Sequence, residues 1–336
     1  MRAGRRTAMF AELLLAALAV PVLAQDSEDL LKLSLSRPAA AYSGEMRVSA
    51  RGQIRTIRVS HAPPDRWRRE ALDSEGKPLL IIVSDGRTQW TYDVRRSLVR
   101  KGEPADPDYK LMDPDEELAL LMRNYELKLS GKEPVAGRSA SVLEVSSRIT
   151  GKPARRLWIG KDGLILRRIA YGEDGAETSS MEFVRIGPLP KGQADFSFVA
   201  PPGVRVVESR WKPDFMDLEE AADASGLEPR LPAWLPQGFV FESVNVMPFK
   251  SGSILHLRFT DGADALSLFQ CPPKARLRLG WRSMGPPKTV RVAGEKARLA
   301  LSAEGKVLDW RRGGQRFVLI GPLSAEAMRK VAESVP

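Results

Sequence analysis

Alternating polar and apolar positions run through much of the first half of the chain. Residues 45–50 (EMRVSA) and 54–61 (IRTIRVSH) follow the two-residue period of a β-strand that has one face in water. Asp-Gly pairs separate several such stretches, and these pairs favour tight hairpin turns because glycine tolerates a positive φ. The pairs are Asp85-Gly86, Asp162-Gly163 and Asp174-Gly175. The pattern therefore predicts a long antiparallel meander of strands.

A helical segment interrupts these strands midway. Asp113 is a favoured residue for capping a helix, Pro114 suits the first helical position, and Glu116 stands where a capping box needs an acid. A second helical pattern lies near the N-terminus, where residues 26–36 (DSEDLLKLSLS) place leucines on one side. The first part of the chain therefore combines a strand meander with two helices.

The rest of the chain repeats this mixture of strands and helices on a smaller scale. Asp217 begins a capped helix that is expected to stop at Gly226, and Ser324 begins a last helix. Strand pairs are predicted around Asp261-Gly262 and around residues 303–306. Antiparallel strands with one or two helices in each part indicate the α+β class.

Length and local composition divide the chain into four segments. A chain of 336 residues predicts about two domains. The sequence WKPD at residues 211–214 is typical of a linker. The predicted segments are a signal peptide at 1–24, a first domain at 25–208, the linker at 209–216 and a smaller second domain at 217–336.

The N-terminal segment has the three parts of a secretory signal peptide. Three arginines precede an apolar run at residues 9–23. Val22 and Ala24 then place small or modest side chains at the −3 and −1 positions of a cleavage site, so we expect cleavage after Ala24. The run is shorter than the roughly 20 residues that cross a membrane. A buried N-terminal helix is the alternative, and Pro21 argues against it because proline breaks helices. We therefore expect export to the periplasm without a membrane anchor.

Composition excludes several classes of protein and of site. Hydrophobic residues make up 43% and charged residues 28%, which is typical of a globular chain and excludes full disorder. The net charge of +10 is spread along the chain, so it indicates an anionic surface or partner rather than nucleic acid. With one cysteine and two histidines, the chain has no disulfide within itself and almost no basis for a Cys/His zinc site.

Residue patterns for catalysis are nearly absent. The sequence has no GxSxG elbow, P-loop or HExxH motif, so we expect a binding protein without cofactors rather than an enzyme. His61 and His256 stand in strand patterns and are typical of sheet residues. The competing class, a hydrolase acting on envelope polymers, would use both histidines. Cys271 is typical of a small, partly buried residue, although a disulfide-linked homo-oligomer stays open.

Four short motifs follow one another along the predicted first domain. They are PDRWR at residues 64–68, VSDGRTQWTYD at 83–93, LWIGKDGLILR at 157–167 and DFSFVAPPG at 195–203. Together with a leading helix, a hairpin meander and an inserted helix, they resemble the half-barrel of the LolA/LolB/LppX-like family over about residues 27–208. The resemblance implies an antiparallel sheet that wraps around helices.

The second domain extends the resemblance. LPAWLPQGF at residues 231–239, followed by a strand that ends at Asp261-Gly262, is similar to the C-terminal domain of the RseB/MucB family. This resemblance implies binding to the periplasmic region of a membrane-spanning anti-sigma factor, with release when an envelope lipid or lipopolysaccharide signal arrives. The alternative is a lipoprotein or lipid carrier of the LolA/LppX type, which would hold acyl chains as cargo.

Large apolar side chains recur on the predicted strands and the inserted helix of the first domain. If the sheet curls around that helix, they line its concave side, where an acyl chain gains about 0.8 kcal/mol per CH₂ group removed from water. The alternative is that they only pack the helix onto the sheet. The candidate lipid-binding residues are Trp67, Trp90, Tyr92, Leu118, Leu121, Met122 and Trp158.

Pairs of neighbouring arginines recur on the same strands. Because neighbours in a strand point to opposite faces, we expect one arginine of each pair in water and the other at a rim. A solvated face explains them without a ligand. Alternatively, they form a basic rim that holds lipid phosphates or an acidic partner segment. The candidate rim residues are Arg68, Arg69, Arg155, Arg156, Arg167 and Arg168.

Overall fold

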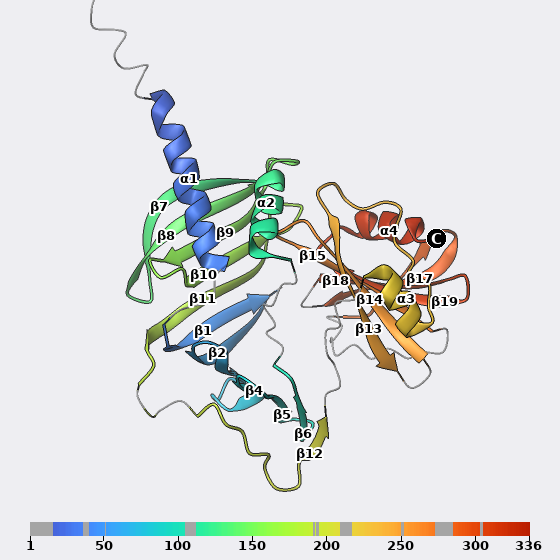
Figure 1. The fold of residues 1–336 in the computed structure, drawn as a ribbon, viewed down its shortest axis with the longest axis horizontal. Coiled ribbons are helices and arrows are strands. Elements are labelled where there is room, and N and C mark those ends of the chain that lie inside the picture. Colours follow the sequence, from blue (N-terminus) through green and yellow to red (C-terminus); the bar gives the residue numbers. More distant parts are fainter. Residues whose placement is uncertain are drawn as a thin grey trace, which may run out of the picture.

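The computed structural model describes most of the chain as two sheets with four helices. The first sheet, α1 and α2 come from residues 16–208, whereas the second sheet, α3 and α4 come from residues 217–336 (Figure 1). The described residues are 16–35, 40–50, 52–104, 112–190, 192, 195–208, 217–249, 252–272, 285–302 and 305–336.

Among the described residues, the first sheet contains twelve strands. These are β1 (Tyr42–Ala50), β2 (Gln53–Ala62), β3 (Arg66–Leu72), β4 (Pro78–Asp85), β5 (Gln89–Asp93), β6 (Leu98–Gly102), β7 (Tyr125–Val135), β8 (Arg138–Ser147), β9 (Pro153–Gly160), β10 (Ile165–Tyr171), β11 (Glu177–Pro188) and β12 (Arg205–Glu208). They lie in the order β12-β6-β5-β4-β3-β2-β1-β11-β10-β9-β8-β7.

Hairpin connections explain most of this order. At the β4–β5 turn, the Asp85 carboxylate accepts hydrogen bonds from the backbone N–H groups of Arg87 (2.8 Å) and Thr88 (2.7 Å). The strands β1–β6 and β7–β11 form two meanders, and the antiparallel pairing of β1 with β11 joins them. Only β12 pairs in parallel with its neighbour, β6, among the described strands. The sheet is therefore open, with β7 and β12 at its edges.

Two helices cover the β7–β9 end of this sheet. Helix α1 (Ala16–Leu35) and helix α2 (Pro114–Asn124) lie side by side there, away from β1–β6 (Figure 1). Leu31 of α1 and Leu118 of α2 share a buried core with Leu143 and Leu157 of the sheet. Burial of this apolar surface holds the helices in place.

The helix starts test two sequence predictions. Asp113 caps α2 as predicted, because its carboxylate accepts a hydrogen bond from the backbone N–H of Asp115 at 2.8 Å. Helix α1 begins at Ala16, ten residues before the predicted start, and runs through Pro21 without a break. The argument from Pro21 against an N-terminal helix is therefore wrong. Cleavage after Ala24 remains a prediction.

The second sheet has seven strands in the part of the chain that the structure describes. These are β13 (Val240–Phe249), β14 (Gly252–Thr260), β15 (Ala265–Cys271), β16 (Lys288–Val292), β17 (Glu295–Ser302), β18 (Gly305–Arg312) and β19 (Gln315–Gly321). Their order is β13-β14-β15-β19-β18-β17-β16, and every neighbouring pair is antiparallel.

Helices α3 (Leu218–Ser225) and α4 (Ala325–Ser334) contribute to the core of this second sheet. Both start as predicted: Asp217 accepts from the Glu220 backbone N–H at 2.8 Å, and Ser324 accepts from that of Ala327 at 3.2 Å. Gly226 ends α3 in the left-handed conformation, also as predicted.

The observed proportions differ from a balanced α+β fold. Strands dominate both parts, because β7 and β12 in the first sheet and β13, β16 and β19 in the second add to the strands that the sequence pattern predicted. The fold is therefore mostly β with few helices. The predicted linker at 209–216 lies outside the described residues, and the domain boundaries remain predictions.

Within the described ranges, no helix combines the length and the apolar character that crossing a membrane requires.

Candidate functional site

The β14–β15 turn of the second sheet forms a rigid projection. The Asp261 carboxylate accepts hydrogen bonds from the backbone N–H groups of Ala263 (2.9 Å) and Asp264 (2.7 Å). Thr260 adds a bond from its hydroxyl to the Asp264 carbonyl at 2.9 Å. Gly262 supplies the positive φ of 94° that the turn needs. These local bonds hold the turn in one shape.

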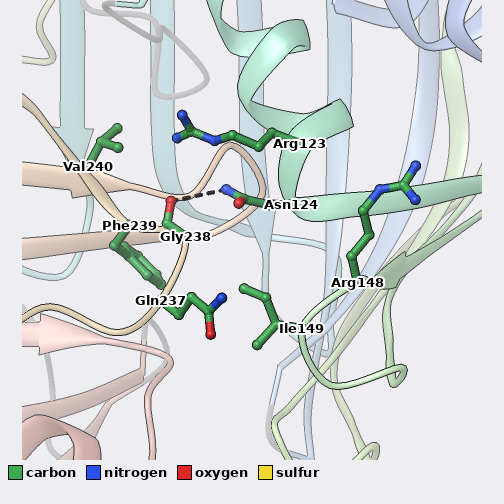
Figure 2. A pocket seen from close by; sticks show the side chains of 8 residues that line it. All are labelled: Arg123, Asn124, Arg148, Ile149, Gln237, Gly238, Phe239 and Val240. Carbon is green, nitrogen blue, oxygen red and sulfur yellow. Dashed lines mark hydrogen bonds between the residues drawn. The ribbon is translucent and has the colours of Figure 1, made fainter.

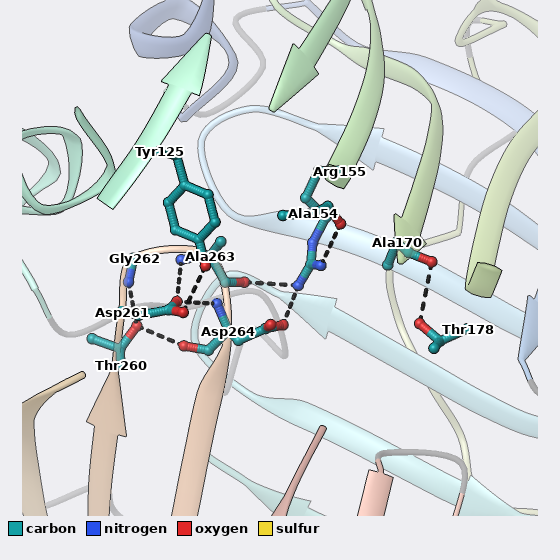
Figure 3. Close-up of polar contacts among 10 residues, drawn as sticks. All are labelled: Tyr125, Ala154, Arg155, Ala170, Thr178, Thr260, Asp261, Gly262, Ala263 and Asp264. Carbon is teal, nitrogen blue, oxygen red and sulfur yellow. Dashed lines mark hydrogen bonds and ion pairs between the residues drawn. The ribbon is translucent and has the colours of Figure 1, made fainter. Parts of the chain in front are cut away.

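This turn docks against the end of α2 and the start of β7. The Tyr125 hydroxyl donates to the Asp261 carboxylate at 2.6 Å, in a buried position (Figure 3). The Asn124 side-chain amide donates to the carbonyls of Asp261 (2.9 Å) and Gly238 (3.0 Å). Two adjacent residues of the first part of the chain therefore bind two loops of the second.

Strand β9 contacts the same turn. The Arg155 guanidinium forms an ion pair with Asp264 and donates to the Ala263 carbonyl at 3.0 Å (Figure 3). Ala263 also packs against the core beneath α2. A Cβ atom on Gly262 would lie only 3.1 Å from the Leu121 backbone nitrogen, so the two surfaces are in close contact. Polar and apolar contacts thus fix this junction together.

Burial sets the protonation of the central pair. Burial, together with the nearby Asp261 charge, raises the pKa of Tyr125 well above its ordinary value. Burial also raises the pKa of the Asp261 carboxyl, whereas the hydrogen bond from Tyr125 acts to lower it. Tyr125 is therefore a protonated donor at neutral pH.

A pocket of about 580 Å³ opens beside this junction (Figure 2). Arg148 is held at its edge, where its Nε donates to the carbonyls of Met122 (3.1 Å) and Tyr125 (2.9 Å). In the view of Figure 2, Arg123 and Arg148 lie on either side of Asn124. The lining residues are Arg123, Asn124, Arg148, Ile149, Gln237, Gly238, Phe239 and Val240. The lining is thus cationic and partly apolar, with no acidic side chain.

The helix residues of the predicted lipid site lie in a packed core. Leu118 and Leu121 are buried against the sheet, and Met122 packs at the edge of the same cluster. Leu143 and Leu157 supply the sheet side of this cluster. The packing alternative therefore describes these three residues in the observed structure.

The aromatic residues of the predicted lipid site do not share one face. Trp67 pairs with Ser84, whereas Trp90 pairs with the adjacent residue Val83, so the two indoles point to opposite faces. Trp158 follows Leu157, which faces α2, and therefore points away from that helix. Tyr92 shares the face of Trp90 and contacts the Phe198 ring at 5.8 Å. The seven candidates therefore lie on both faces of the sheet, and their role in lipid binding stays a prediction.

Trp158 is enclosed by charged side chains instead. The guanidinium carbons of Arg156 and Arg167 lie 4.9 and 4.4 Å from its ring centroids. Its Nε1 donates to Glu133 at 2.6 Å, and Glu133 also pairs with Arg156 at 3.1 Å. Only 1% of Trp158 is exposed, so this cluster is a packing feature of the strands.

The predicted basic rim is dispersed in the same way. Arg155 binds the turn of the second sheet, and Arg68 pairs with Glu70 at 2.8 Å. Arg69 is half-buried on the face opposite to Arg68, and Arg168 is exposed beside Leu157 in the pairing of β9 with β10. Arg156 and Arg167 lie over the Trp158 ring. The six candidate arginines therefore do not form one anion-binding rim.

The two histidines belong to different sheets. His61 in β2 stacks on Tyr42, with ring centroids 5.2 Å apart. His256 in β14 stacks on Phe269 at 4.3 Å, and its Nε2 lies 2.9 Å from the Ser267 hydroxyl. Burial lowers the pKa of His256 to about 3. Each histidine thus has its own packing partners, and neither contact joins the two into one catalytic site.

Cys271 is fully buried, and burial raises the pKa of its thiol to about 12. A disulfide with a second copy would require this strand to open first. In the part of the chain that the structure describes, no group of three or more His, Cys, Asp or Glu residues is placed to hold a metal ion.

Sequence reasoning missed the residues that join the two sheets, apart from Arg155, which it placed in the basic rim. Asp261-Gly262 is recognisable as a turn, but nothing in its neighbourhood indicates that the turn is buried. Asn124 and Tyr125 fall where α2 passes directly into β7, a transition that the pattern does not predict. The alternating sequence YELKL at residues 125–129 was the available signal for β7.

Comparisons with known proteins identify a family. The model of the MucB/RseB N-terminal domain matches residues 27–193. The solved complex of Pseudomonas aeruginosa MucA/MucB matches with a TM-score of 0.58 at 20% identity, covering 93% of this chain and 98% of that chain. A crystal structure of MucB, with the same coverage, gives a TM-score of 0.54 at 21% identity. No curated protein sequence matches the chain.

At this identity the structural likeness shows a shared fold, extending over both sheets of the chain. The family match covers the first sheet as far as β11 and includes Asn124, Tyr125 and Arg155 of the junction. The chain belongs to the MucB/RseB family.

Proposed function

We propose that this protein is a periplasmic, non-enzymatic regulator that binds the periplasmic part of a membrane-spanning anti-sigma factor. The observation that carries the proposal is its family membership, combined with a fold that matches MucB over 93% of the chain. MucB has been solved in complex with MucA(peri), and that structure matches this chain with a TM-score of 0.56. The proposal carries over from MucB only the kind of partner, and not the details of the contact.

Export and domain division are parts of the same proposal. The regulator would lose residues 1–24 on export and work with a half-barrel domain at 25–208 and a second domain at 217–336. The net charge of the full chain, +10, suits a partner segment or an envelope surface that carries negative charge.

Release by an envelope lipid or lipopolysaccharide is the finer part of the proposal. Leu118 and Leu121 already fill the space between α2 and the sheet, so an acyl chain entering there has to displace α2. The end of α2 carries Asn124, which binds the second sheet. Displacement of α2 would therefore disturb the junction, and this connects lipid binding to the arrangement of the two domains.

The partner proposal is tested by direct binding. The probe is the purified periplasmic region of the anti-sigma factor whose gene lies beside the gene for this protein. Titration calorimetry should show saturable binding with a defined stoichiometry. An absence of binding at protein concentrations of tens of micromolar would overturn the proposal.

Native mass spectrometry of the protein purified from the periplasm tests the lipid part. A regulator should be recovered mainly without ligand and should release its partner when lipopolysaccharide is added. Stoichiometric acylated cargo, with no effect on any partner, would instead favour a lipoprotein or lipid carrier.

A further inference from the structure

The pocket beside the junction carries unbalanced positive charge. Its two ionisable lining residues are Arg123 and Arg148, and neither forms an ion pair with a carboxylate in the described ranges. Many other described arginines do have carboxylate partners, as Arg138 has Asp162 at 2.7 Å and Arg185 has Glu45 at 3.1 Å. Unpaired guanidinium groups at a concave surface favour an anionic ligand.

The two arginines have different roles. The Nε of Arg148 is already bound to the Met122 and Tyr125 carbonyls, so this side chain stabilises the turn from α2 into β7. Arg123 is exposed, and its guanidinium is free to form a bidentate hydrogen bond to a carboxylate. Figure 2 shows the two cations apart, on either side of Asn124, rather than meeting at one point. This spacing suits charges distributed along a chain better than one compact anion.

Apolar surface completes the lining. Ile149 is 43% exposed at the β8–β9 turn, and Phe239 and Val240 line the pocket from the second part of the chain. A volume of about 580 Å³ holds a few side chains of a bound segment. The occupant that fits both features is an extended peptide with acidic and apolar side chains.

We infer that this pocket binds an acidic, partly apolar segment of the anti-sigma partner, with Arg123 as the main anchor for a partner carboxylate. The inference rests on the proposed function. Because α2 and the β8–β9 turn form one wall and the loop before β13 forms the other, the segment contacts both parts of the chain. Binding therefore depends on the junction that Tyr125 and Asp261 hold together.

Charge reversal of Arg123 tests the inference. The probe is again the purified periplasmic region of the anti-sigma factor, titrated into the full chain. Arg123→Glu should weaken binding at least about tenfold, since a charge-assisted hydrogen bond is lost and a repulsion added. Arg95→Glu makes the same change of charge in the exposed β5–β6 turn and should stay within about twofold of the wild type.

A second pair of variants tests the apolar part of the pocket. Ile149→Ser should weaken binding roughly fivefold because it removes apolar contact. Ile54→Ser changes an isoleucine that is 67% exposed on β2 and should have no effect. In a double-mutant cycle, replacing the acidic residues of the bound segment by amides should abolish the difference between wild type and Arg123→Glu.

The outcomes separate this inference from the proposed function. If the wild type binds the probe and Arg123→Glu binds it equally well, the pocket assignment is wrong while the regulator proposal stands. If the wild type does not bind the probe, both fail. If Arg123→Glu reduces binding to phosphatidylglycerol vesicles but leaves binding to the probe unchanged, the pocket serves a lipid and the inference is overturned.

Discussion

At the scale of single residues, the Tyr125–Asp261 bond is a buried polar contact that joins the two sheets. Tyr125→Phe removes a donor 2.6 Å from a buried carboxylate that also serves two backbone N–H groups. We expect the free energy of unfolding to fall by about 1–3 kcal/mol, because a buried charged acceptor loses a partner. Urea denaturation followed by tryptophan fluorescence measures the change.

Tyr92→Phe is the matched control. Tyr92 is half-buried on the first sheet and contacts Phe198 through its ring, so loss of its hydroxyl should cost less than about 0.5 kcal/mol. Equal losses of stability in the two variants would contradict the importance assigned to the Tyr125 bond.

His256 is expected to make the free energy of unfolding depend on pH. Burial, and less so the nearby Arg258 charge, lower its pKa to about 3, whereas an unfolded histidine binds a proton below about pH 6.5. Between these values the unfolded state holds more protons, so the free energy of unfolding falls as pH falls, by up to about 1.4 kcal/mol per pH unit. His256→Gln removes this contribution. Its urea midpoint should therefore depend less steeply on pH between 6.5 and 4 than that of the wild type.

Equal slopes for the wild type and His256→Gln would show that the histidine takes up its proton while the protein remains folded. The comparison uses slopes rather than absolute midpoints, since the substitution also changes the contact with Ser267.

At the scale of elements, the start of α2 can be tested with two acidic residues that have different roles. Asp113 accepts the capping hydrogen bond, whereas Glu116 lies in the first turn of the helix. Asp113→Ala removes the side chain that accepts the Asp115 N–H and should lower the free energy of unfolding by about 1 kcal/mol. Glu116→Ala, in the exposed first turn, removes only a favourable interaction with the helix dipole and should cost less. Circular dichroism during thermal unfolding measures both. A larger loss in Glu116→Ala would mean that the capping box, not the Asp113 cap alone, starts the helix.

Elements with local signals could be predicted from the sequence, and those defined by distant contacts could not. The caps at Asp113, Asp217 and Ser324 and the turn at Asp85 depend on side chains that bond to nearby backbone, so their positions can be read from the chain. Strand β12 has four exposed residues and exists because it pairs with β6, about a hundred residues earlier. No local pattern contains that information.

The candidate site shows the same division. The alternation within a strand is local, so the sequence predicts that Trp67 and the residues next to it point to opposite faces of the sheet. What packs against each face depends on which strands pair, and that is not a local property. Trp90 and Trp158 were grouped with the α2 residues because all are large and apolar, and the pairing of the strands places them on the opposite face. The sequence pattern places Arg155 at a rim for lipid phosphates or an acidic partner segment, whereas in the structure its guanidinium binds Asp264 of the same chain, 109 positions later.

At the scale of the whole molecule, the arrangement of the two sheets depends on a turn that leaves little room for a side chain. A Cβ atom on Gly262 would lie 3.0–3.3 Å from the side chain and backbone of Leu121, so Gly262→Ala should push the two sheets apart. Gly76→Ala is the matched control, because Gly76 has a similar positive φ, 78° against 94°, and open space around it. Both variants bear the cost of a left-handed alanine, about 1 kcal/mol, and only one disturbs the junction.

Small-angle X-ray scattering distinguishes the two variants. Gly262→Ala should increase the radius of gyration and lengthen the maximum dimension, while Gly76→Ala should scatter like the wild type. Because the pocket takes one wall from each part of the chain, the same variant should also bind the anti-sigma probe more weakly. Unchanged scattering in Gly262→Ala would mean that Leu121 moves aside without cost and that Tyr125, Asn124 and Arg155 alone hold the sheets together.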